Sequence, residues 1–257
     1  MKGNNDMIRI IMHGCNGKMG QVITNLLKDD KNAMIVAGVD PYDDGHNAYP
    51  VFSSFDSCVV KADVIIDFAS PKAMDSLLVY AAKEGVPAVL CTTGLSDEQI
   101  KNIEETSKKV AILKSANMSL GINVMFKLLQ AVAKVLVPAG FDVELVEKHH
   151  NQKVDAPSGT ALALADAIRE ALPDDYFYKY DRTQENAKRN PKEIGIASIR
   201  GGTIVGEHEV IFAGEDEVLE FKHTAYSKAI FAKGAIEAAK FLAGKTAGFY
   251  DMKDVIG

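Results

Sequence analysis

Long apolar runs, an excess of positive charge and closely spaced cysteines are all missing from this sequence. No apolar stretch approaches the roughly 20 residues that a helix needs to span a bilayer, and the first residues lack the apolar core of a signal peptide. The formal net charge is −6, which disfavours nucleic acid as a partner because phosphate binding needs a basic surface. These absences predict a cytoplasmic protein that binds neither a membrane nor nucleic acid.

The cysteines do not form a recognisable framework. Cys15, Cys58 and Cys91 are odd in number and far apart, so neither a set of disulfides nor a metal-binding pair is expected. His149 and His150 are adjacent and would point to opposite sides of an extended chain. Because no cysteine or carboxylate lies at a ligand spacing from them, we predict that the chain has no metal site.

The first half of the chain alternates short buried strands with amphipathic helices. A length of 257 residues favours two domains over one. Apolar runs predict strands at residues 8–12, 34–39, 64–66, 88–90 and 110–113. Helices are expected between them, at residues 19–27 and 73–82 and after the capping box formed by Ser96 and Gln99. Strands separated by helices pair in parallel, so we predict an α/β fold with a doubly wound parallel sheet of the Rossmann type.

The pattern changes after about Gly121. Helices are expected at residues 122–136 and from Gly159 to just before Pro173, with a strand at 143–146 between them. Residues 173–195 are polar and lack periodicity, which predicts a loop. Closely spaced strands at 196–199, 208–212 and 218–224 then indicate a mixed or antiparallel sheet in a central α+β domain. The last helix, at 228–242, is amphipathic and is expected to return to the first domain. We therefore predict one domain at residues 1–121, completed by 228–257, and a second at 122–227.

A glycine loop joins the first strand to the first helix. Gly14, Gly17 and Gly20 allow a sharp turn and let a pyrophosphate approach the amides at the helix start. Asp40 ends the second strand about 20 residues further on, where an acid typically holds the ribose of NAD. The same residues also fit a turn without a ligand and a solvated aspartate. We favour a nicotinamide dinucleotide, NADH or NADPH, held by Gly14, Cys15, Asn16, Gly17, Lys18, Met19 and Asp40.

Two further segments follow predicted parallel strands and therefore share the same sheet edge. They are residues 91–94 and 115–118, whose side chains are mostly small or carry a hydroxyl group. Such side chains allow a nicotinamide ribose to come close, although each segment could also be a plain turn. The predicted cofactor contacts here are Cys91, Thr92, Thr93, Ser115, Ala116, Asn117 and Met118.

Polar residues are most concentrated between positions 147 and 160. The paired His149 and His150 suit proton transfer near neutral pH, and Lys153 can bind an anion or donate a proton. The helix that follows begins with Ser158, Gly159 and Thr160. Its free amides can receive a substrate carboxylate. The alternative is a solvated loop with an N-capping serine, but this concentration of cationic groups favours a site for a small anionic substrate.

Other polar residues have weaker claims to a role in the site. His208 and His223 lie on predicted strands, where histidines are more often structural or exposed than catalytic. Residues 200–203, Arg-Gly-Gly-Thr, could reach an anion and equally fit a hairpin turn.

Residues 147–161 form the most specific motif of the chain, with both histidines, Lys153 and the run Asp-Ala-Pro-Ser-Gly-Thr. This motif resembles the 4-hydroxy-tetrahydrodipicolinate reductase (dihydrodipicolinate reductase) family. The resemblance extends along nearly the whole chain, through residues 13–20, 67–71, 92–94, 116–124, 200–208 and 231–235.

The resemblance implies an oxidoreductase of the diaminopimelate route to lysine. A hydride would pass from the nicotinamide to the unsaturated ring of a cyclic dicarboxylate, giving tetrahydrodipicolinate. The first domain would bind the dinucleotide, and the second would bind substrate and assemble a homotetramer. His149 matches the proton donor or acceptor of the family and Lys153 its proton donor. His150, Gly159 and Thr160 match its substrate contacts.

Two positions depart from the family pattern. Cys91 stands where the family often has glycine, and Pro41 and Tyr42 follow Asp40 where NADPH-preferring members commonly carry a basic residue. We therefore expect NADH to be used at least as well as NADPH, with Lys18 as the residue available to a 2′-phosphate. Another two-domain amino-acid dehydrogenase and a non-catalytic dinucleotide sensor are the competing interpretations. A substrate panel separates the first from the reductase, and the absence of turnover would identify the second.

Overall fold

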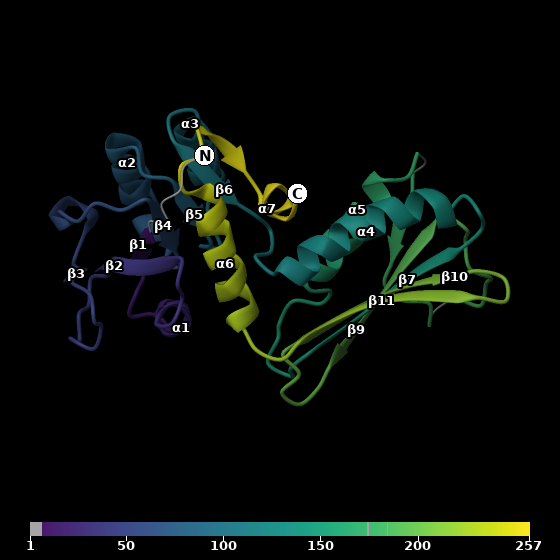
Figure 1. Cartoon of the computed structure of the whole chain (residues 1–257). Helices are drawn as coiled ribbons and strands as arrows, with labels where there is room; N and C mark the ends of the chain where they lie inside the picture. Colours follow the sequence, from purple (N-terminus) through teal and green to yellow (C-terminus); the bar gives the residue numbers. More distant parts are fainter. Residues whose placement is uncertain (1–6, 174, 184) are drawn as a thin grey trace. The chain divides into compact units, whose positions relative to one another are not determined.

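A computed structural model describes residues 7–173, 175–183 and 185–257. The chain divides into two compact units (Figure 1). The first unit holds the chain up to Ser119 together with Ala229–Gly257, and the second holds Leu120–Lys228. Among the residues that the structure describes, no helix is long and apolar enough to cross a membrane.

A seven-stranded sheet forms the centre of the first unit, in the order β12-β6-β5-β4-β1-β2-β3. Its strands are β1 (Ile8–His13), β2 (Ala33–Val39), β3 (Val51–Phe52), β4 (Val64–Asp67), β5 (Ala88–Leu90), β6 (Ala111–Lys114) and β12 (Gly248–Tyr250). Every pairing between them is parallel. The predicted α/β class with a doubly wound parallel sheet is confirmed.

Helices cover both faces of this sheet. They are α1 (Lys18–Leu27), α2 (Met74–Glu84), α3 (Asp97–Ser107), α6 (Ala229–Leu242) and α7 (Met252–Ile256), with short 3₁₀ helices at Phe55–Ser57 and Pro71–Ala73. Leu77 of α2 and Ile103 of α3 pack on one face, while α6 contacts α1 and runs along β4 and β5 (Figure 1). The capping box at the start of α3 forms as predicted, because Ser96 and Gln99 each accept a hydrogen bond from the other's backbone amide.

The second unit is built on a five-stranded sheet in the order β11-β10-β7-β9-β8. Its strands are β7 (Asp142–His149), β8 (Phe177–Lys179), β9 (Glu193–Arg200), β10 (Gly206–Ala213) and β11 (Val218–Ala225). β9 runs parallel to β7 and β8, whereas β10 is antiparallel to β7 and β11, so the predicted mixed sheet is confirmed. Helices α4 (Leu120–Leu136) and α5 (Gly159–Glu170) cover one face of this sheet, where Leu129 and Leu164 pack against Phe212 (Figure 1).

The prediction of a loop over residues 173–195 is wrong in part. β8 lies within this segment and β9 already begins at Glu193, while positions 174 and 184 lie outside the described residues. β8 has only three residues and sits at the edge of the sheet, so it shows no periodicity. The short β3, β12 and α7, of two, three and five residues, escaped prediction for the same reason.

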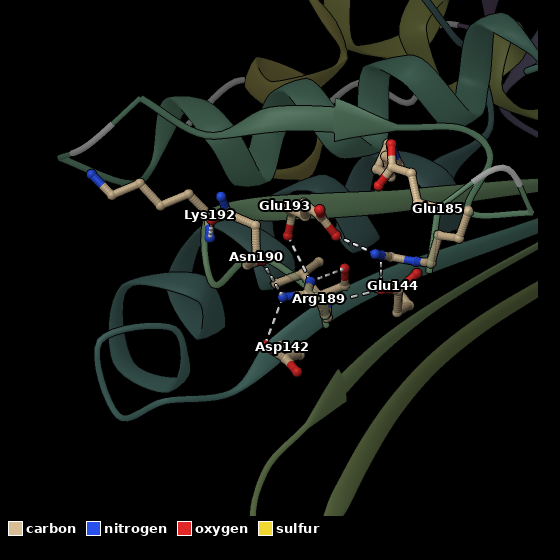
Figure 2. Close-up of polar contacts among 10 residues, drawn as sticks. Asp142, Glu144, Glu185, Arg189, Asn190, Lys192 and Glu193 are labelled. Atoms are coloured by element: carbon tan, nitrogen blue, oxygen red, sulfur yellow. Dashed lines mark hydrogen bonds and ion pairs between the residues drawn. The ribbon is translucent and has the colours of Figure 1, made fainter. Parts of the chain in front are cut away.

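Arginines tie this polar segment to the sheet (Figure 2). Arg189 lies 2.6 Å from the carboxylate of Asp142 and 3.0 Å from that of Glu144. Arg182 contacts Glu144 at 2.7 Å and also pairs with Glu193. The charges that made the segment resemble a solvated loop therefore hold it against the first residues of β7 and β9.

β7 is longer than the predicted strand and carries part of the polar cluster. We expected it to end at Val146, but it continues to His149. Its alternate residues Val143, Leu145, Glu147 and His149 are all buried. The buried side of the strand thus ends in two polar side chains. Because these are not apolar, a search for apolar residues places the end of the strand too early.

Candidate active site

The predicted cofactor-binding residues lie at one edge of the first sheet. Residues 14–17 follow β1, Asp40 follows β2, residues 91–94 follow β5, and residues 115–118 follow β6. Because these strands are parallel, their carboxyl ends meet at the same edge, where open α/β sheets bind ligands. The role of these residues in binding stays a prediction.

The glycine loop has the close packing that a dinucleotide loop requires. Gly14 has a φ of +78°, and a Cβ on it would lie 2.9 Å from the carbonyl oxygen of Phe68. A Cβ on Gly20 would lie 2.3 Å from the carbonyl oxygen of Gly14, so α1 can approach the loop only with glycine there. Gly17 caps α1 without a side-chain hydrogen bond. The first amides of α1 therefore have no side-chain cap, and the loop fits a bound pyrophosphate.

Asp40 is buried and holds the backbone around it. Its Oδ2 accepts a hydrogen bond from the amide of Asn16 at 3.0 Å, and its Oδ1 accepts one from the amide of Tyr42 at 3.1 Å. Asp40 thus opens the turn after β2, as the competing interpretation expected, and also fixes the glycine loop. A carboxylate has about four acceptor positions, so capacity remains for the hydroxyl groups of a ribose.

Two other residues at this edge, Thr92 and Cys15, have buried side chains. The hydroxyl oxygen of Thr92 is buried and has no hydrogen-bond partner among the described residues, which fits a loop that receives a polar ligand. Burial, together with the Asp40 carboxylate, raises the pKa of Cys15 to about 12. A thiol with that pKa stays protonated and unreactive, so Cys15 is a small buried filler of the loop.

The second unit holds a buried carboxylate whose acceptor positions are all occupied. Oε1 of Glu147 accepts hydrogen bonds from Nη2 of Arg200 at 2.7 Å and from the amide of Ser158 at 3.2 Å. Oε2 lies 2.9 Å from Nη1 of Arg200 and 2.5 Å from Nδ1 of His149. Burial favours a higher pKa for Glu147, but hydrogen bonds from Arg200, Ser198 and His149 outweigh it and lower the pKa to about 2.

His149 has one engaged and one open ring nitrogen. Because Glu147 is ionised, Nδ1 of His149 is the donor in their hydrogen bond. Nε2 faces Gly206, where an added Cβ would lie 3.1 Å away. The ring also meets that of His208 edge-on, with centroids 5.2 Å apart. Burial lowers the pKa of His149 despite the opposing effect of Glu147.

Lys153 and the start of α5 complete this group. Nζ of Lys153 lies 2.8 Å from the carboxylate of Asp155, whose backbone oxygen accepts a hydrogen bond from Arg200 at 2.6 Å. Ser158 caps α5 by accepting from the amide of Ala161 at 3.1 Å. The predicted residues His149, Lys153 and Ser158 are therefore all connected to one buried ion pair, and Gly159 and Thr160 form the first turn of α5.

Comparison with known proteins assigns the family. Residues 8–118 match the family profile described as "Dihydrodipicolinate reductase, N-terminus", and residues 121–256 match "Dihydrodipicolinate reductase, C-terminus". The chain belongs to the dihydrodipicolinate reductase family. It is therefore an oxidoreductase, and the predicted family and enzyme class are confirmed.

Members of this family match this chain over nearly its full length. A protein of Caldanaerobacter subterraneus subsp. tengcongensis, named 4-hydroxy-tetrahydrodipicolinate reductase, is 52% identical over 254 residues, covering 97% of this chain and 98% of the relative. One of the same name from Clostridium tetani is 51% identical over 246 residues, covering 96% of each. The solved structure of a dipicolinate-bound dihydrodipicolinate reductase from Paenisporosarcina sp. TG-14 is similar with a TM-score of 0.81 at 26% identity, covering 96% of this chain and 98% of that one.

Sequence reasoning missed three residues of this candidate site. We gave Glu147 no role, expected His208 to be structural or exposed, and left Arg200 between anion binding and a turn. The structure pairs Arg200 with Glu147 and places His208 Nε2 3.0 Å from the hydroxyl oxygen of Ser158. Glu147 and His149 share the buried face of a strand with apolar residues, and that alternation could have indicated a partnered carboxylate.

The buried His208 should make the stability of this reductase depend on pH. Burial, helped by His149, lowers its pKa from 6.5 to about 4. A group with a depressed folded-state pKa contributes its stability above the unfolded pKa and loses it as pH falls through the folded pKa. We expect the free energy of unfolding to fall between about pH 6.5 and about pH 4, with His208 contributing on the order of 3 kcal/mol.

Urea denaturation across this pH range measures the effect. His208→Asn should reduce the pH dependence, whereas His46→Asn, which removes an exposed histidine, should leave it unchanged. Equal pH dependence in the wild type and in His208→Asn would show that His208 is not the group responsible.

Proposed function

We propose that this chain reduces 4-hydroxy-tetrahydrodipicolinate, or its dehydrated form, to tetrahydrodipicolinate in the diaminopimelate route of lysine biosynthesis. The observation that carries the proposal is the grouping of His149, Lys153 and the start of α5 around the buried Glu147–Arg200 pair. Reduction of a cyclic dicarboxylate needs a proton source and sites for carboxylates, and this group contains both. The names of full-length relatives support the same reaction.

His149 and Lys153 are the proposed proton-transfer residues. A bound nicotinamide cofactor supplies the hydride, so the chain itself must manage the proton. His149 holds one ring nitrogen against Glu147 and leaves Nε2 for donating or accepting a proton. Lys153 is half-buried and bound to Asp155, which keeps its ammonium group at the site until a substrate carboxylate competes for it.

The remaining predicted residues are proposed to hold the substrate carboxylates. Ser158 stands at the N-cap of α5, and Gly159 and Thr160 are the first residues of the helix. Helix-start amides and the helix dipole favour an anion at this position. His150, half-buried next to His149, adds a polar group for the second carboxylate.

Loss of either proton-transfer residue should reduce turnover strongly. We expect His149→Gln and Lys153→Ala each to lower kcat at least about a hundredfold, the lower range for a positioned proton-transfer group. The assay follows oxidation of NADH and NADPH while a synthase forms the dipicolinate precursor from pyruvate and aspartate semialdehyde. His46→Gln and Lys188→Ala, which change exposed residues, are the matched controls.

Near-normal turnover in both site variants would refute the assigned roles. A wild-type protein that binds NADH without any turnover of the precursor would refute the reductase function itself. It would favour the dinucleotide sensor or a dehydrogenase of another substrate.

The cofactor is proposed to bind at the edge of the first sheet, with NADH used at least as well as NADPH. The turn after β2 contains Asp40, Asp43 and Asp44 and carries no lysine or arginine. A 2′-phosphate there would meet negative charge, and Lys18, exposed at the start of α1, is the cation available to offset it.

Kinetics with both cofactors test this preference. The wild type should show a kcat/KM with NADH equal to or above that with NADPH. Tyr42→Arg places a cation on an exposed residue of the turn and should shift the ratio toward NADPH by a few-fold to about tenfold. A wild-type kcat/KM much lower with NADH than with NADPH would contradict the proposal.

The second unit is also proposed to assemble the chain into a homotetramer. Helices α4 and α5 both lie on one face of its sheet (Figure 1). Strand alternation places Ile199 and Val218 on the other face, where they are 47% and 59% exposed. An open sheet face with exposed apolar side chains fits an interface between copies.

Light scattering during gel filtration tests the assembly. We expect a particle of four times the chain mass of 27.8 kDa. Ile199→Glu should shift it to smaller species, because a charge would be buried at the interface, whereas Val59→Glu changes an exposed residue of the first unit and should not. A monomeric wild type would refute the tetramer, and an unaffected Ile199→Glu variant would refute this face.

A further inference from the structure

The proposed reaction uses His149 and Lys153 and gives no task to the carboxylate beside them. Glu147 is fully buried, with an exposed fraction of 0%. A buried ion pair commonly contributes no more stability than well-packed apolar residues would. Stability alone is therefore a weak reason for an ionised side chain at the end of β7, next to the site.

The hydrogen bonds of Glu147 determine which nitrogen of His149 carries the proton. A neutral imidazole has one donor and one acceptor nitrogen. The ionised carboxylate, 2.5 Å from Nδ1, can only accept, so Nδ1 carries the hydrogen and Nε2 is left for proton transfer. The space around Nε2 exists because residue 206 is glycine.

Arg200 keeps this arrangement in place. Its Nη1 and Nη2 both bind the Glu147 carboxylate, a two-pronged contact that fixes the carboxylate plane as well as its charge. Nη2 also binds the backbone oxygen of Asp155. The same carboxylate accepts from the amide of Ser158 at the start of α5, so one ion pair holds both His149 and the proposed carboxylate site.

We propose that Glu147, held by Arg200, is the positioning residue of this site: it fixes the Nδ1–H tautomer of His149 and ties that ring to the start of α5. Its value for proton transfer rests on the proposed function. The hydrogen-bond geometry itself can be tested without substrate.

The charged groups that face His149 predict opposite shifts of its pKa for two substitutions. They are Glu147 on β7, Lys153 on the following loop, Arg200 on β9 and His208 on β10. Besides burial, Lys153 and Arg200 lower the pKa of His149, while Glu147 raises it. Removing Glu147 should therefore move the titration of His149 to lower pH, and removing Arg200 should move it to higher pH. A general loss of structure would not produce opposite shifts.

Ring nuclear magnetic resonance of the labelled full chain measures tautomer and titration together. The His149 signals are assigned by their absence in His149→Gln. We expect the wild type to show the Nδ1–H form, Glu147→Gln to lose its dominance and titrate at lower pH, and Arg200→Gln to titrate at higher pH. Glu170→Gln, an exposed carboxylate at the far end of α5, is the matched control and should match the wild type.

Kinetics supply the second readout. Glu147→Gln should lower kcat by on the order of a hundredfold. The limb of the kcat–pH profile that belongs to His149 is identified by its absence in His149→Gln. In Glu147→Gln this limb should move to lower pH. Because Glu147→Gln leaves the half-buried Arg200 without its partner and can fail to fold, Gly206→Ala serves as a second variant. It keeps the ion pair, crowds Nε2, and should lower kcat while the Nδ1–H form persists.

The outcomes separate this proposal from the proposed function. An unchanged tautomer and titration in Glu147→Gln, or full activity in Gly206→Ala when the wild type is active, would overturn the positioning role. A wild type without reductase activity but with the predicted ring behaviour would refute the function and leave the hydrogen-bond geometry supported.

Discussion

The buried ion pair between Glu147 and Arg200 is the constraint on which the candidate active site depends. It joins the end of β7 to the end of β9 and also binds the backbone at Asp155 and Ser158. Removing Arg200 would leave the buried charge of Glu147 without its partner, which typically costs about 3–5 kcal/mol. The loop between β7 and α5 therefore has few alternatives to its observed path, and His149 and Lys153 are carried by that path.

In the first unit a single carboxylate likewise fixes the backbone of a loop. Asp40 at the end of β2 fixes the amide of Asn16 in the glycine loop and that of Tyr42 in its own turn. In both units an acidic side chain at or just after the end of a strand holds loop backbone by accepting an amide hydrogen bond. These loops are positioned more precisely in this way, because the side chain that fixes them belongs to the rigid sheet.

Sequence patterns predicted the elements whose stabilising contacts are local. The capping box of Ser96 and Gln99 joins residues three positions apart, and the order of strands and helices in the first unit follows from apolar periodicity. The segment before β9 failed because its order comes from Arg182 and Arg189, which bind acids of β7 far away in sequence. Its composition alone could not distinguish paired charges from solvated ones.

The site shows the same division between local and distant contacts. His149, His150 and Lys153 lie within a few positions and could be recognised as one group, whereas Arg200 is 53 positions from Glu147 and His208 is 50 from Ser158. Only the pairing of β9 and β10 with β7 brings these residues together. The residues proposed to touch substrate can therefore be found from a short motif. Those proposed to set the tautomer and charge of His149 are brought to it only by strand register. The motif at residues 147–160 therefore does not describe the site fully, because Arg200 and His208 lie outside it.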